Sequence, residues 1–232
     1  MKALILAAGK GSRLGTIGEE TPKPLLAVGG RPILEHHLNR CANAGVREVF
    51  INTHHLAGQI RDFCGDGSRW GLKITFSFEP VLLGTAGAVN AFRSRLDGEP
   101  FIVIYGDNVM ELELPEFIRT HCSKRPVATV AVHYREDVST SGMVVTDDSG
   151  RIRSFIEKPA PSQQVSHWVN AAVYLLEPDV LDFIPREGFS DFGRDVFPAL
   201  LAEGRHLHSF QLAGDVHPVD TPELLAEARK RR

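Results

Sequence analysis

The sequence predicts an α/β fold with a Rossmann-like, mixed but mainly parallel sheet and flanking helices. In the first half, short apolar runs alternate with segments of helical period, which is typical of βαβ units and a parallel sheet. In the second half, apolar runs follow one another at close spacing, which indicates paired strands. The chain has 232 residues and no low-complexity segment or linker, so we expect one continuous domain over residues 1–232.

The first half begins with a buried strand, expected over residues 2–7, that leads into a glycine loop. A helix is expected over 32–44, because Pro32 suits the first turn and Gly45 follows the last one. The other elements expected here are strands at 47–52, 72–78 and 101–105 and helices at 56–63 and 85–95.

The second half is expected to contain strands at 127–133, 142–146, 152–157, 169–176 and 207–212 and a helix at 191–202. Asp147-Asp148-Ser149-Gly150, between the second and third of these strands, predicts a hairpin turn. A final helix is expected to start at Pro222, with Thr221 as its cap. It ends in Lys230-Arg231-Arg232, whose positive charges suit the C-terminal end of a helix dipole.

Composition excludes several classes of protein. With 26 Lys and Arg against 29 Asp and Glu, the net charge of -3 argues against a protein that grips nucleic acid through its phosphates. Three cysteines without a C-x-x-C pair argue against a disulfide framework or a zinc cluster. The histidine pairs find no third ligand at metal-binding spacing, so we expect these histidines on the surface or in loops. The pairs are His36-His37, His54-His55 and His206-x-His208.

The N-terminus superficially resembles a signal peptide. Its apolar run, Ala3–Ala8, has only six residues before Gly9 and is shorter than the usual hydrophobic region of such a peptide. No other run approaches the ~20 apolar residues of a membrane-spanning helix. We therefore expect a cytoplasmic protein with no membrane contact.

Two segments of the first half favour anion binding. The loop Gly9–Gly15 follows the first strand, where α/β folds bind ligands, and its glycines let backbone N–H groups approach an anion beside Lys10 and Arg13. Downstream, Lys23 lies between two prolines that fix the backbone, so it could clamp a phosphate as a point charge. The structural alternatives are a simple turn and a kinked connector with a solvated lysine.

The glycine loop matches neither of two better-known fingerprints. A dinucleotide-binding loop requires a glycine where Leu14 stands and an acidic residue at the end of the second strand, which holds Asn52. A P-loop requires lysine after its last glycine, but Ser12 follows Gly11. An NAD-dependent oxidoreductase is therefore disfavoured.

The segment Leu6–Leu14, followed after six residues by Thr21-Pro22-Lys23-Pro24-Leu25, resembles the signature of the sugar-1-phosphate nucleotidyltransferases, or NDP-sugar pyrophosphorylases. The resemblance implies a fold of the nucleotide-diphospho-sugar transferase type, with a nucleotide-binding half at about 1–110 and a sugar-phosphate-binding half at about 111–232. It implies that the first loop wraps the base and the triphosphate. The nucleotide-binding residues that it implies are Leu6, Ala7, Ala8, Gly9, Gly11, Ser12, Arg13, Gly84 and Thr85.

The last two of these residues belong to Leu83-Gly84-Thr85-Ala86-Gly87, which resembles the family's next element. Small residues at a helix start permit close approach of a flat ligand and offer free N–H donors. Packing of these residues against the sheet is the alternative.

Two aspartates are the candidate metal ligands. Asp107 follows the strand at 101–105, where a carboxylate suits Mg²⁺ but also a turn or cap. In the family it resembles, this aspartate binds metal. The family's second metal ligand lies in Asp-x-Gly-Thr-Pro, whereas this chain has Asp220-Thr221-Pro222 without the glycine. Asp220 therefore either reaches the Mg²⁺ ion or only caps the final helix.

Segments of the second half resemble the family's sugar-phosphate site. Lys158, in Glu157-Lys158-Pro159, matches the lysine that contacts the sugar phosphate, and a solvated pair with Glu157 is the alternative. Asn170 matches the asparagine that meets sugar hydroxyls, although the family usually has glycine where Ala172 stands. The sugar-phosphate-binding residues implied are Gly142, Glu157, Lys158 and Asn170, and the catalytic residues implied are Arg13, Lys23, Asp107 and Lys158.

The resemblance implies an enzyme that transfers a nucleotidyl group from an NTP to a sugar 1-phosphate, giving pyrophosphate and a nucleotide sugar, a polysaccharide precursor. Only ten residues follow Pro222, so we expect no appended domain, as in guanylyltransferases that use GTP with mannose 1-phosphate or manno-heptose 1-phosphate. UTP, dTTP or CTP with another sugar 1-phosphate is the alternative. A second hypothesis is a catalytically silent nucleotide-sugar sensor, favoured by the altered segment at Asp220. The sequence leaves open whether the chain forms a homo-oligomer.

Overall fold

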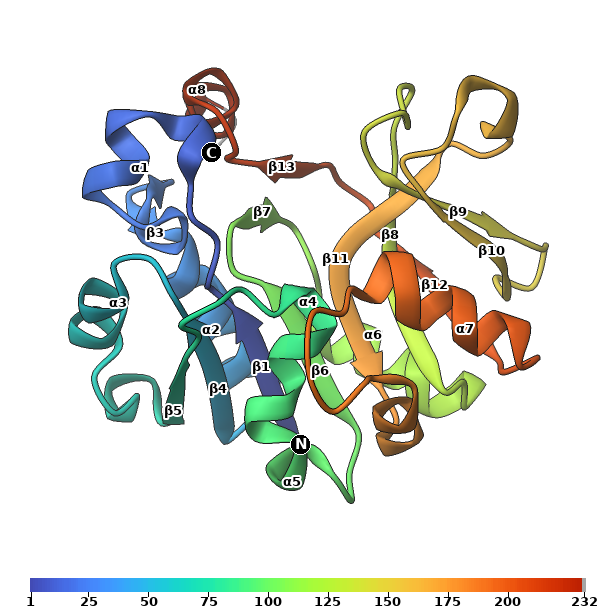
Figure 1. The fold of residues 1–232 in the computed structure, drawn as a ribbon, viewed down its shortest axis with the longest axis horizontal. Coiled ribbons are helices and arrows are strands. Elements are labelled where there is room, and N and C mark those ends of the chain that lie inside the picture. Colours follow the sequence, from blue (N-terminus) through green and yellow to red (C-terminus); the bar gives the residue numbers. More distant parts are fainter. Residues whose placement is uncertain (231–232) are drawn as a thin grey trace. The chain divides into compact units, whose positions relative to one another are not determined.

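A computed structural model describes residues 1–230, which form two compact units (Figure 1). Arg231 and Arg232, expected at the basic end of the last helix, lie outside the described residues. The first unit, called here the N-terminal unit, comprises residues 1–82, 103–110 and 216–230. The second, called here the central unit, comprises residues 83–102 and 111–215.

The N-terminal unit is built on parallel strands. β1 (Lys2–Leu6) pairs with β4 (Glu48–Thr53), which pairs with β5 (Lys73–Phe78). On the other side of β1 lies β6 (Phe101–Tyr105). Leu4 and Phe50, partners in the register, are fully buried, as the continuous apolar runs of a covered parallel sheet require. Figure 1 shows the helices α2 (Ile33–Asn43) and α3 (Ala57–Cys64) flanking these strands, so the parallel strands and these two helices of the expected first half are confirmed.

Short elements complete the N-terminal unit. A buried cluster that includes Leu14, Val109, Val219 and Leu225 joins the glycine loop to the last helix. The chain thereby brings segments together that lie far apart in the sequence. The short elements of the N-terminal unit are η1 (Ser12–Leu14), α1 (Thr16–Glu20), η2 (Lys23–Leu25), β2 (Ala27–Val28), β3 (Arg31–Pro32), η3 (Ser68–Trp70), β7 (Asn108–Met110), β13 (Val216–Pro218) and α8 (Pro222–Lys230).

The central unit contains a mixed arrangement of strands. β11 (Trp168–Leu176) pairs antiparallel with β8 (Ala128–Tyr134) and β9 (Gly142–Thr146), while β12 (Leu207–Gln211) runs parallel to β8. β10 (Ile152–Glu157) pairs antiparallel with β9 through the expected hairpin. Within that turn, Asp147 Oδ1 accepts the N–H of Ser149 at 2.9 Å, and Gly150 has a φ of 83°.

The helices of the central unit differ from expectation in two places. The helix expected over 85–95 is divided into α4 (Gly84–Gly87), the 3₁₀ turn η4 (Ala88–Phe92) and α5 (Arg93–Leu96). The helix expected over 191–202 is a π-helical turn, η7 (Phe192–Val196), followed by α7 (Phe197–Ala202). Pro198 lies in the first turn of α7, where its missing N–H breaks the regular hydrogen-bond ladder. The remaining helical elements are α6 (Leu114–Lys124), η5 (Pro161–Gln163) and η6 (Pro178–Phe183).

Two histidines of the sequence pairs occupy buried positions. His37, on the inner face of α2, is 1% exposed, and His208, on β12, is 5% exposed. The expectation that the histidine pairs lie on the surface or in loops is wrong for these two residues. Burial lowers the pKa of His208, so its neutral ring is favoured.

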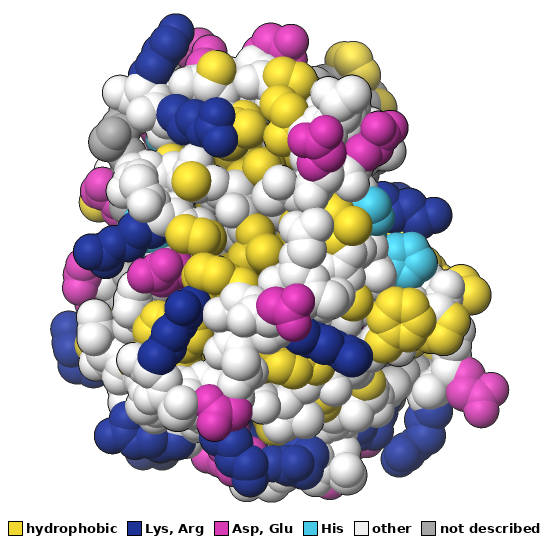
Figure 2. Space-filling view, turned by 90° about the vertical axis from the view of Figure 1, so that its left-hand side faces the viewer, with side chains coloured by type: hydrophobic (Ala, Val, Ile, Leu, Met, Phe, Trp, Pro, Cys, Tyr) yellow, Lys and Arg dark blue, Asp and Glu magenta, His cyan; other side chains and the backbone are white. Residues whose placement is uncertain are grey.

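The surface shows no sorting of charge on the face drawn in Figure 2. Lysine and arginine side chains lie there among aspartates and glutamates, with apolar side chains between them. Among the helices within residues 1–230, none has the length and apolar character needed to cross a bilayer.

A bulge in β11 leads to a first testable prediction. Its register with β8 shifts between Asn170 and Tyr174, and Ala172 within the bulge has a φ of 60°, in the left-handed region. That φ costs alanine about 1–2 kcal/mol. Ala172→Gly removes this cost but loses a buried methyl and adds chain entropy, together also about 1–2 kcal/mol. We expect an almost unchanged free energy of unfolding in urea denaturation. The buried neighbour Ala171, whose φ is negative, should lose about 1–2 kcal/mol as Ala171→Gly, because the same methyl and entropy losses are not offset there. Equal losses in both variants would contradict the strain at Ala172.

Candidate active site

The start of the glycine loop is held by the ends of two neighbouring strands. The backbone N–H of Ala7 donates to Asn52 Oδ1 at 2.9 Å, and Asn52 Nδ2 donates to Glu79 Oε1 at 2.7 Å. Asn52 and Glu79 are each 3% exposed. Neither residue was predicted as a positioning group, because Asn52 was considered only as the absence of an acid. A polar residue that ends an otherwise apolar strand was the available signal.

The loop itself is stabilised by the short helix that follows it. The N–H of Leu14 donates to the carbonyl oxygen of Gly11 at 2.9 Å, and a Cβ added at Gly18 in α1 would overlap that same carbonyl oxygen. His55 Nε2 lies 2.8 Å from the carbonyl oxygen of Gly18 and fixes α1 in turn. The predicted site residues Gly9, Ser12 and Arg13 remain exposed, while Leu6 is half-buried and Ala7, Ala8 and Gly11 are buried. The loop therefore presents a fixed, partly exposed backbone with an exposed arginine.

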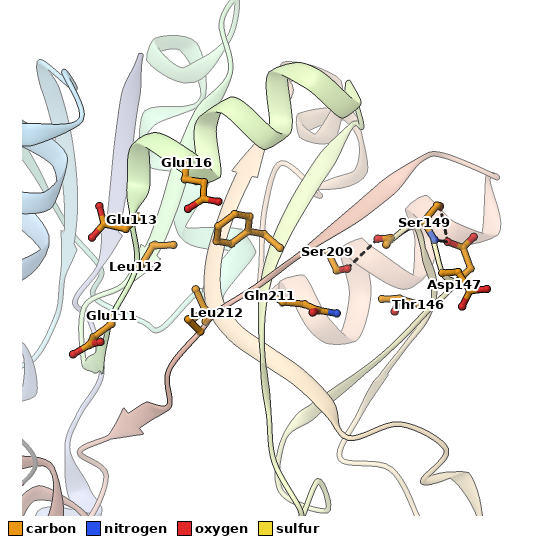
Figure 3. Close-up of a pocket in the computed structure, with 14 residues that line it drawn as sticks. Glu111, Leu112, Glu113, Glu116, Thr146, Asp147, Ser149, Ser209, Gln211 and Leu212 are labelled. Carbon is orange, nitrogen blue, oxygen red and sulfur yellow. Dashed lines mark hydrogen bonds between the residues drawn. The ribbon is translucent and has the colours of Figure 1, made fainter.

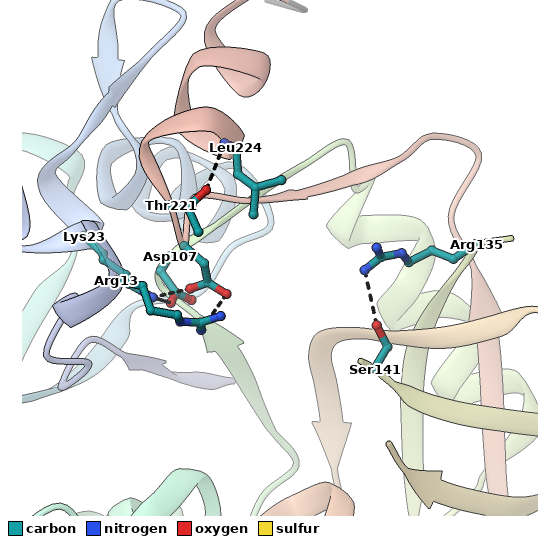
Figure 4. Close-up of polar contacts among 8 residues, drawn as sticks. Arg13, Lys23, Asp107, Arg135, Ser141, Thr221 and Leu224 are labelled. Carbon is teal, nitrogen blue, oxygen red and sulfur yellow. Dashed lines mark hydrogen bonds and ion pairs between the residues drawn. The ribbon is translucent and has the colours of Figure 1, made fainter. Parts of the chain in front are cut away.

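Two cationic and two anionic side chains among the predicted residues form one cluster in the N-terminal unit (Figure 4). The ammonium group of Lys23, which is only 7% exposed, bonds Asp220 Oδ1 and lies 3.4 Å from Asp107 Oδ2. The guanidinium of Arg13 pairs with Asp220 Oδ2 at 2.9 Å. A lysine this deeply buried requires ionic partners, and the two aspartates supply them. We call Arg13, Lys23, Asp107 and Asp220 the charge cluster.

Backbone contacts place Asp107 of the charge cluster. The N–H of Gly106 donates to the carbonyl oxygen of Leu6 at 2.8 Å. A Cβ at Gly106 would lie 2.9 Å from that oxygen, so glycine is needed where the chain leaves β6. The close approach sets the end of β6 beside the end of β1. Asp107 therefore follows directly at the carboxyl ends of the parallel strands.

Asp220 is placed by the start of α8. The hydroxyl of Thr221 accepts the N–H of Leu224 at 3.3 Å, so Thr221 caps the helix, as expected. The alternative that Asp220 only caps the final helix is wrong, because its carboxylate bonds Lys23 and Arg13 instead. The shortened segment without a glycine still brings Asp220 into the charge cluster.

The electrostatics of the charge cluster fit a divalent cation. Burial and the negative charge of Asp220 raise the pKa of Asp107, while Lys23 acts in the opposite direction. A cation between the carboxylates would offset both the burial cost and the repulsion, and carboxylate oxygens are ligands that Mg²⁺ prefers. Within residues 1–230, no group of three or more His, Cys, Asp or Glu side chains is arranged to hold a metal. The two aspartates thus fit Mg²⁺ if phosphate oxygens and water complete its coordination.

In the central unit, two of the donors at the start of α4 are already occupied. The N–H groups of Ala86 and Gly87 donate to the carbonyl oxygen of Ser190 at 2.9 and 3.0 Å. A Cβ at Gly84, whose φ is 78°, would overlap that carbonyl oxygen. The expectation of free N–H donors at this helix start is therefore wrong for Ala86 and Gly87, because the segment before η7 occupies them, while the N–H groups of Gly84 and Thr85 keep no partner among the described residues. The predicted contact of Gly84 with a base or ribose stays a prediction.

Thr85 is also engaged by the segment before η7. Its hydroxyl donates to Asp191 Oδ2 at 2.8 Å and accepts the N–H of Phe192 at 3.0 Å. Asp191 Oδ1 in turn accepts the N–H groups of Gly193 and Arg194, each at 3.0 Å. Asp191 thus has a structural role as the cap of η7, and a ligand contact of Thr85 stays a prediction.

The predicted sugar-phosphate residues Gly142 and Glu157 lie together in the central unit. A Cβ at Gly142 would come within 2.9 Å of Glu157 Oε2, and one at Gly193 within 3.2 Å, so two glycines make room for this carboxylate. Burial and the charge of Asp191 raise the pKa of Glu157, against the effect of Lys158. Gly193, which was not predicted as a site residue, helps to form this site.

Lys158 and Asn170 keep bonding capacity for a ligand. Lys158 is exposed and has a φ of 50°, and its N–H donates to the carbonyl oxygen of Ser141 at 3.0 Å. A non-glycine residue in the left-handed region is uncommon, and such strain is often found at functional sites. Asn170 Oδ1 accepts the N–H of Ala172 at 2.9 Å, and Asn170 Nδ2 donates to Tyr174 at 2.7 Å. The amide therefore still has one N–H and one lone pair for a sugar hydroxyl.

A cavity of about 770 Å³ in the central unit contains none of the predicted site residues (Figure 3). Its lining includes the acidic residues Glu111, Glu113, Glu116, Asp147 and Asp148. Asp147 already serves the hairpin turn and Arg153, whose guanidinium lies 2.6 Å from its carboxylate. A lining with this charge opposes the binding of phosphates, so we do not place the substrate there.

Comparison with known proteins decides the family. Residues 2–216 match the family model described as nucleotidyl transferase. The chain belongs to the nucleotidyl transferase family. The resemblance of the loop and lysine segments to sugar-1-phosphate nucleotidyltransferases is thereby confirmed.

Named relatives of this nucleotidyl transferase chain differ in base and sugar. It is 37% identical over 88% of its length to a UTP–glucose-1-phosphate uridylyltransferase of Synechocystis sp., of which it covers 56%. It is 33% identical over 92% of its length to the mannose-1-phosphate guanylyltransferase catalytic subunit beta of Drosophila melanogaster, of which it covers 58%. The chain thus spans a little over half the length of these curated relatives.

A solved structure confirms the predicted fold class. The crystal structure of a putative glucose-1-phosphate thymidylyltransferase from Bacillus anthracis, in complex with a sucrose, has a TM-score of 0.90 to this chain. The two chains are 25% identical, with coverage of 100% of this chain and 94% of the other. The mixed, mainly parallel sheet with flanking helices is the fold that they share.

Proposed function

We propose that this chain transfers a nucleotidyl group from an NTP to a sugar 1-phosphate. A phosphate oxygen of the sugar 1-phosphate attacks the α-phosphorus of the NTP, the bond from the α-phosphorus to the bridging oxygen breaks, and pyrophosphate leaves. The charge cluster carries this proposal, because two cations and two carboxylates converge beside a glycine loop at the strand ends. Such an arrangement suits polyphosphate better than any neutral ligand.

The protein's own contribution is binding, orientation and charge neutralisation. Arg13, which is 68% exposed on its side chain, can leave Asp220 and follow a triphosphate, whereas buried Lys23 is fixed and acts from one position. In the central unit, exposed Lys158 would contact the sugar phosphate. Asp107 and Asp220 would hold Mg²⁺, which when bound withdraws charge from phosphate oxygens.

A more specific part of the proposal concerns which NTP and which sugar 1-phosphate are the substrates. We favour GTP with mannose 1-phosphate or manno-heptose 1-phosphate, and the mannose-1-phosphate guanylyltransferase among the relatives supports this pair. The uridylyltransferase among the relatives supports the alternative of UTP with glucose 1-phosphate. dTTP and CTP belong to the same alternative.

A catalytically silent nucleotide-sugar sensor is the second candidate function. The observation that favours it is the pairing of both cluster cations with Asp220, which lies in the altered segment. The presence of both aspartates beside Lys23 opposes it, because binding alone does not require two carboxylates near a phosphate site.

A pyrophosphate-release assay distinguishes these functions. GTP, UTP, dTTP, CTP and ATP are each combined with mannose, manno-heptose and glucose 1-phosphates, with and without Mg²⁺. We expect Mg²⁺-dependent release with one preferred pair. Binding of a nucleotide sugar in calorimetry without release from any pair would support the sensor and contradict the transferase.

A further inference from the structure

Arg135 lies in the central unit, directly after β8, and its backbone is fixed at both polar groups. Its N–H donates to the carbonyl oxygen of His167 at 2.9 Å, and its carbonyl oxygen lies 3.1 Å from His167 Nδ1. Its guanidinium Nη1 donates to the hydroxyl of Ser141 at 3.2 Å (Figure 4). The arginine is therefore held in place from its backbone to the end of its side chain.

The guanidinium of Arg135 makes no direct ion pair with an acid among the described residues. Within the described chain, Arg135 forms no ion pair, although it is half-buried, and its side-chain partner is the neutral hydroxyl of Ser141. The nearby carboxylate of Asp137 accepts the N–H of Ser139 at 2.9 Å. Hydrogen bonding from Ser139 and, to a smaller extent, the charge of Arg135 lower the pKa of Asp137, so Asp137 offsets Arg135 only from a distance. A half-buried cation normally has an anionic partner, because desolvation of an unpaired charge is costly. We therefore expect a bound ligand to supply the anionic partner of the Arg135 guanidinium.

Ser141 connects Arg135 to the predicted sugar-phosphate site. Its carbonyl oxygen accepts the N–H of Lys158 at 3.0 Å, while its hydroxyl oxygen accepts from Arg135 at 3.2 Å. The next residue, Gly142, contacts the carboxylate region of Glu157. Lys158, like Arg135, has no ion pair among residues 1–230. One serine thus bonds both residues, Arg135 through its guanidinium and Lys158 through its backbone N–H, and its hydroxyl hydrogen is still available to donate.

We propose that Arg135 is a second cationic ligand, beside Lys158, for the phosphate of the sugar 1-phosphate, and that Ser141 positions both. This inference rests on the proposed function. The phosphate of a sugar monoester is mostly dianionic at neutral pH, and one lysine neutralises only part of its charge. The planar guanidinium can bind two of its oxygens at once, while the Ser141 hydroxyl donates to a third. The fixed backbone of Arg135 keeps the ordering cost of this contact low.

The test separates binding of the sugar phosphate from binding of the nucleotide. Arg135→Gln should raise KM for the sugar 1-phosphate by about tenfold or more, since a charge-assisted hydrogen bond is lost, and leave KM for the NTP unchanged. Arg135→Lys should raise this KM less than Arg135→Gln does, because lysine keeps the positive charge but cannot bind two phosphate oxygens as a guanidinium does. Ser141→Ala should raise the same KM by a few fold. Arg119→Gln, an exposed arginine on α6, is the matched control and should behave as wild type.

Calorimetry with mannose 1-phosphate and glucose 1-phosphate provides a readout that does not depend on turnover. If wild type releases pyrophosphate and Arg135→Gln keeps the wild-type KM and Kd for the sugar phosphate, the role of Arg135 is wrong and the proposed function stands. A lower melting temperature in Arg135→Gln with unchanged KM would show a structural clamp instead. If wild type binds a sugar phosphate without turnover, the proposed function fails, and the Kd of Arg135→Gln still decides the role of the arginine. If wild type shows neither binding nor turnover, both proposals fail.

Discussion

Lys23→Met is expected to lower pyrophosphate release by about 10²–10³-fold or more, because it removes a fixed positive charge that would act on developing phosphate charge. Lys23 is 7% exposed and lies between two carboxylates, so no flexible residue can take its place. The assay uses the NTP and sugar 1-phosphate pair that wild type prefers. Lys73→Met, which changes an exposed lysine on β5, is the matched control and should keep wild-type activity.

The same substitution has a cost in stability that must be separated from its effect on chemistry. Without the ammonium, Asp107 and Asp220 face each other with less compensation, and we expect a loss of about 1–3 kcal/mol, since their side chains are partly exposed. The double variant Lys23→Met/Asp107→Asn should recover stability but not activity. Near-wild-type release by Lys23→Met would contradict the role of the charge cluster.

Asp107→Asn is expected to abolish turnover to a similar degree while the protein remains at least as stable as wild type at neutral pH. The pKa of Asp107 is raised in the folded state by burial and by Asp220. The contribution of Asp107 to the free energy of unfolding is therefore greatest below the ordinary pKa that an aspartate has in the unfolded chain. This contribution is lost as the pH rises through the raised pKa of the folded state. Asparagine removes this titration, and Lys23 keeps Asp220 as a partner.

Denaturation curves of wild type and Asp107→Asn across the acidic range measure this effect. The difference in the free energy of unfolding should move in favour of the variant as the pH rises from below about 4 toward neutrality. The opposite trend would be a difference that moves in favour of wild type as the pH rises. That result would show that Asp107 stabilises the fold in its ionised form.

Local patterns predicted the regular part of the fold. The parallel strands are continuous apolar runs with glycine or proline near their ends, and their expected positions agree with the structure to within one or two residues. α6 was not expected, although Pro115 lies in its first turn, because His121 interrupts the apolar period after Leu114 and Phe117. That histidine is buried and bonds Thr129 and Glu177, so it occupies a core position despite its polarity.

The candidate site was predictable only where a motif carried it. Arg13, Lys23 and Asp107 lie in recognisable segments, and the structure brings them together with Asp220. The bond between Ala7 and Asn52 joins residues 45 positions apart, and no local pattern specifies it. Likewise, the cover over the start of α4 comes from Ser190, about a hundred positions downstream. Contacts of this kind depend on tertiary packing, which propensity and spacing do not describe.

The central claim is that Asp107 and Asp220 form a divalent-metal site in the charge cluster. Binding of Mn²⁺, followed by electron paramagnetic resonance with the preferred NTP present, tests it directly and needs no turnover. Wild type should bind Mn²⁺, and Asp107→Asn and Asp220→Asn should each weaken binding by about tenfold or more. Asp62→Asn, which changes an exposed acid on α3, is the control. Wild-type affinity in either cluster variant would contradict the claim.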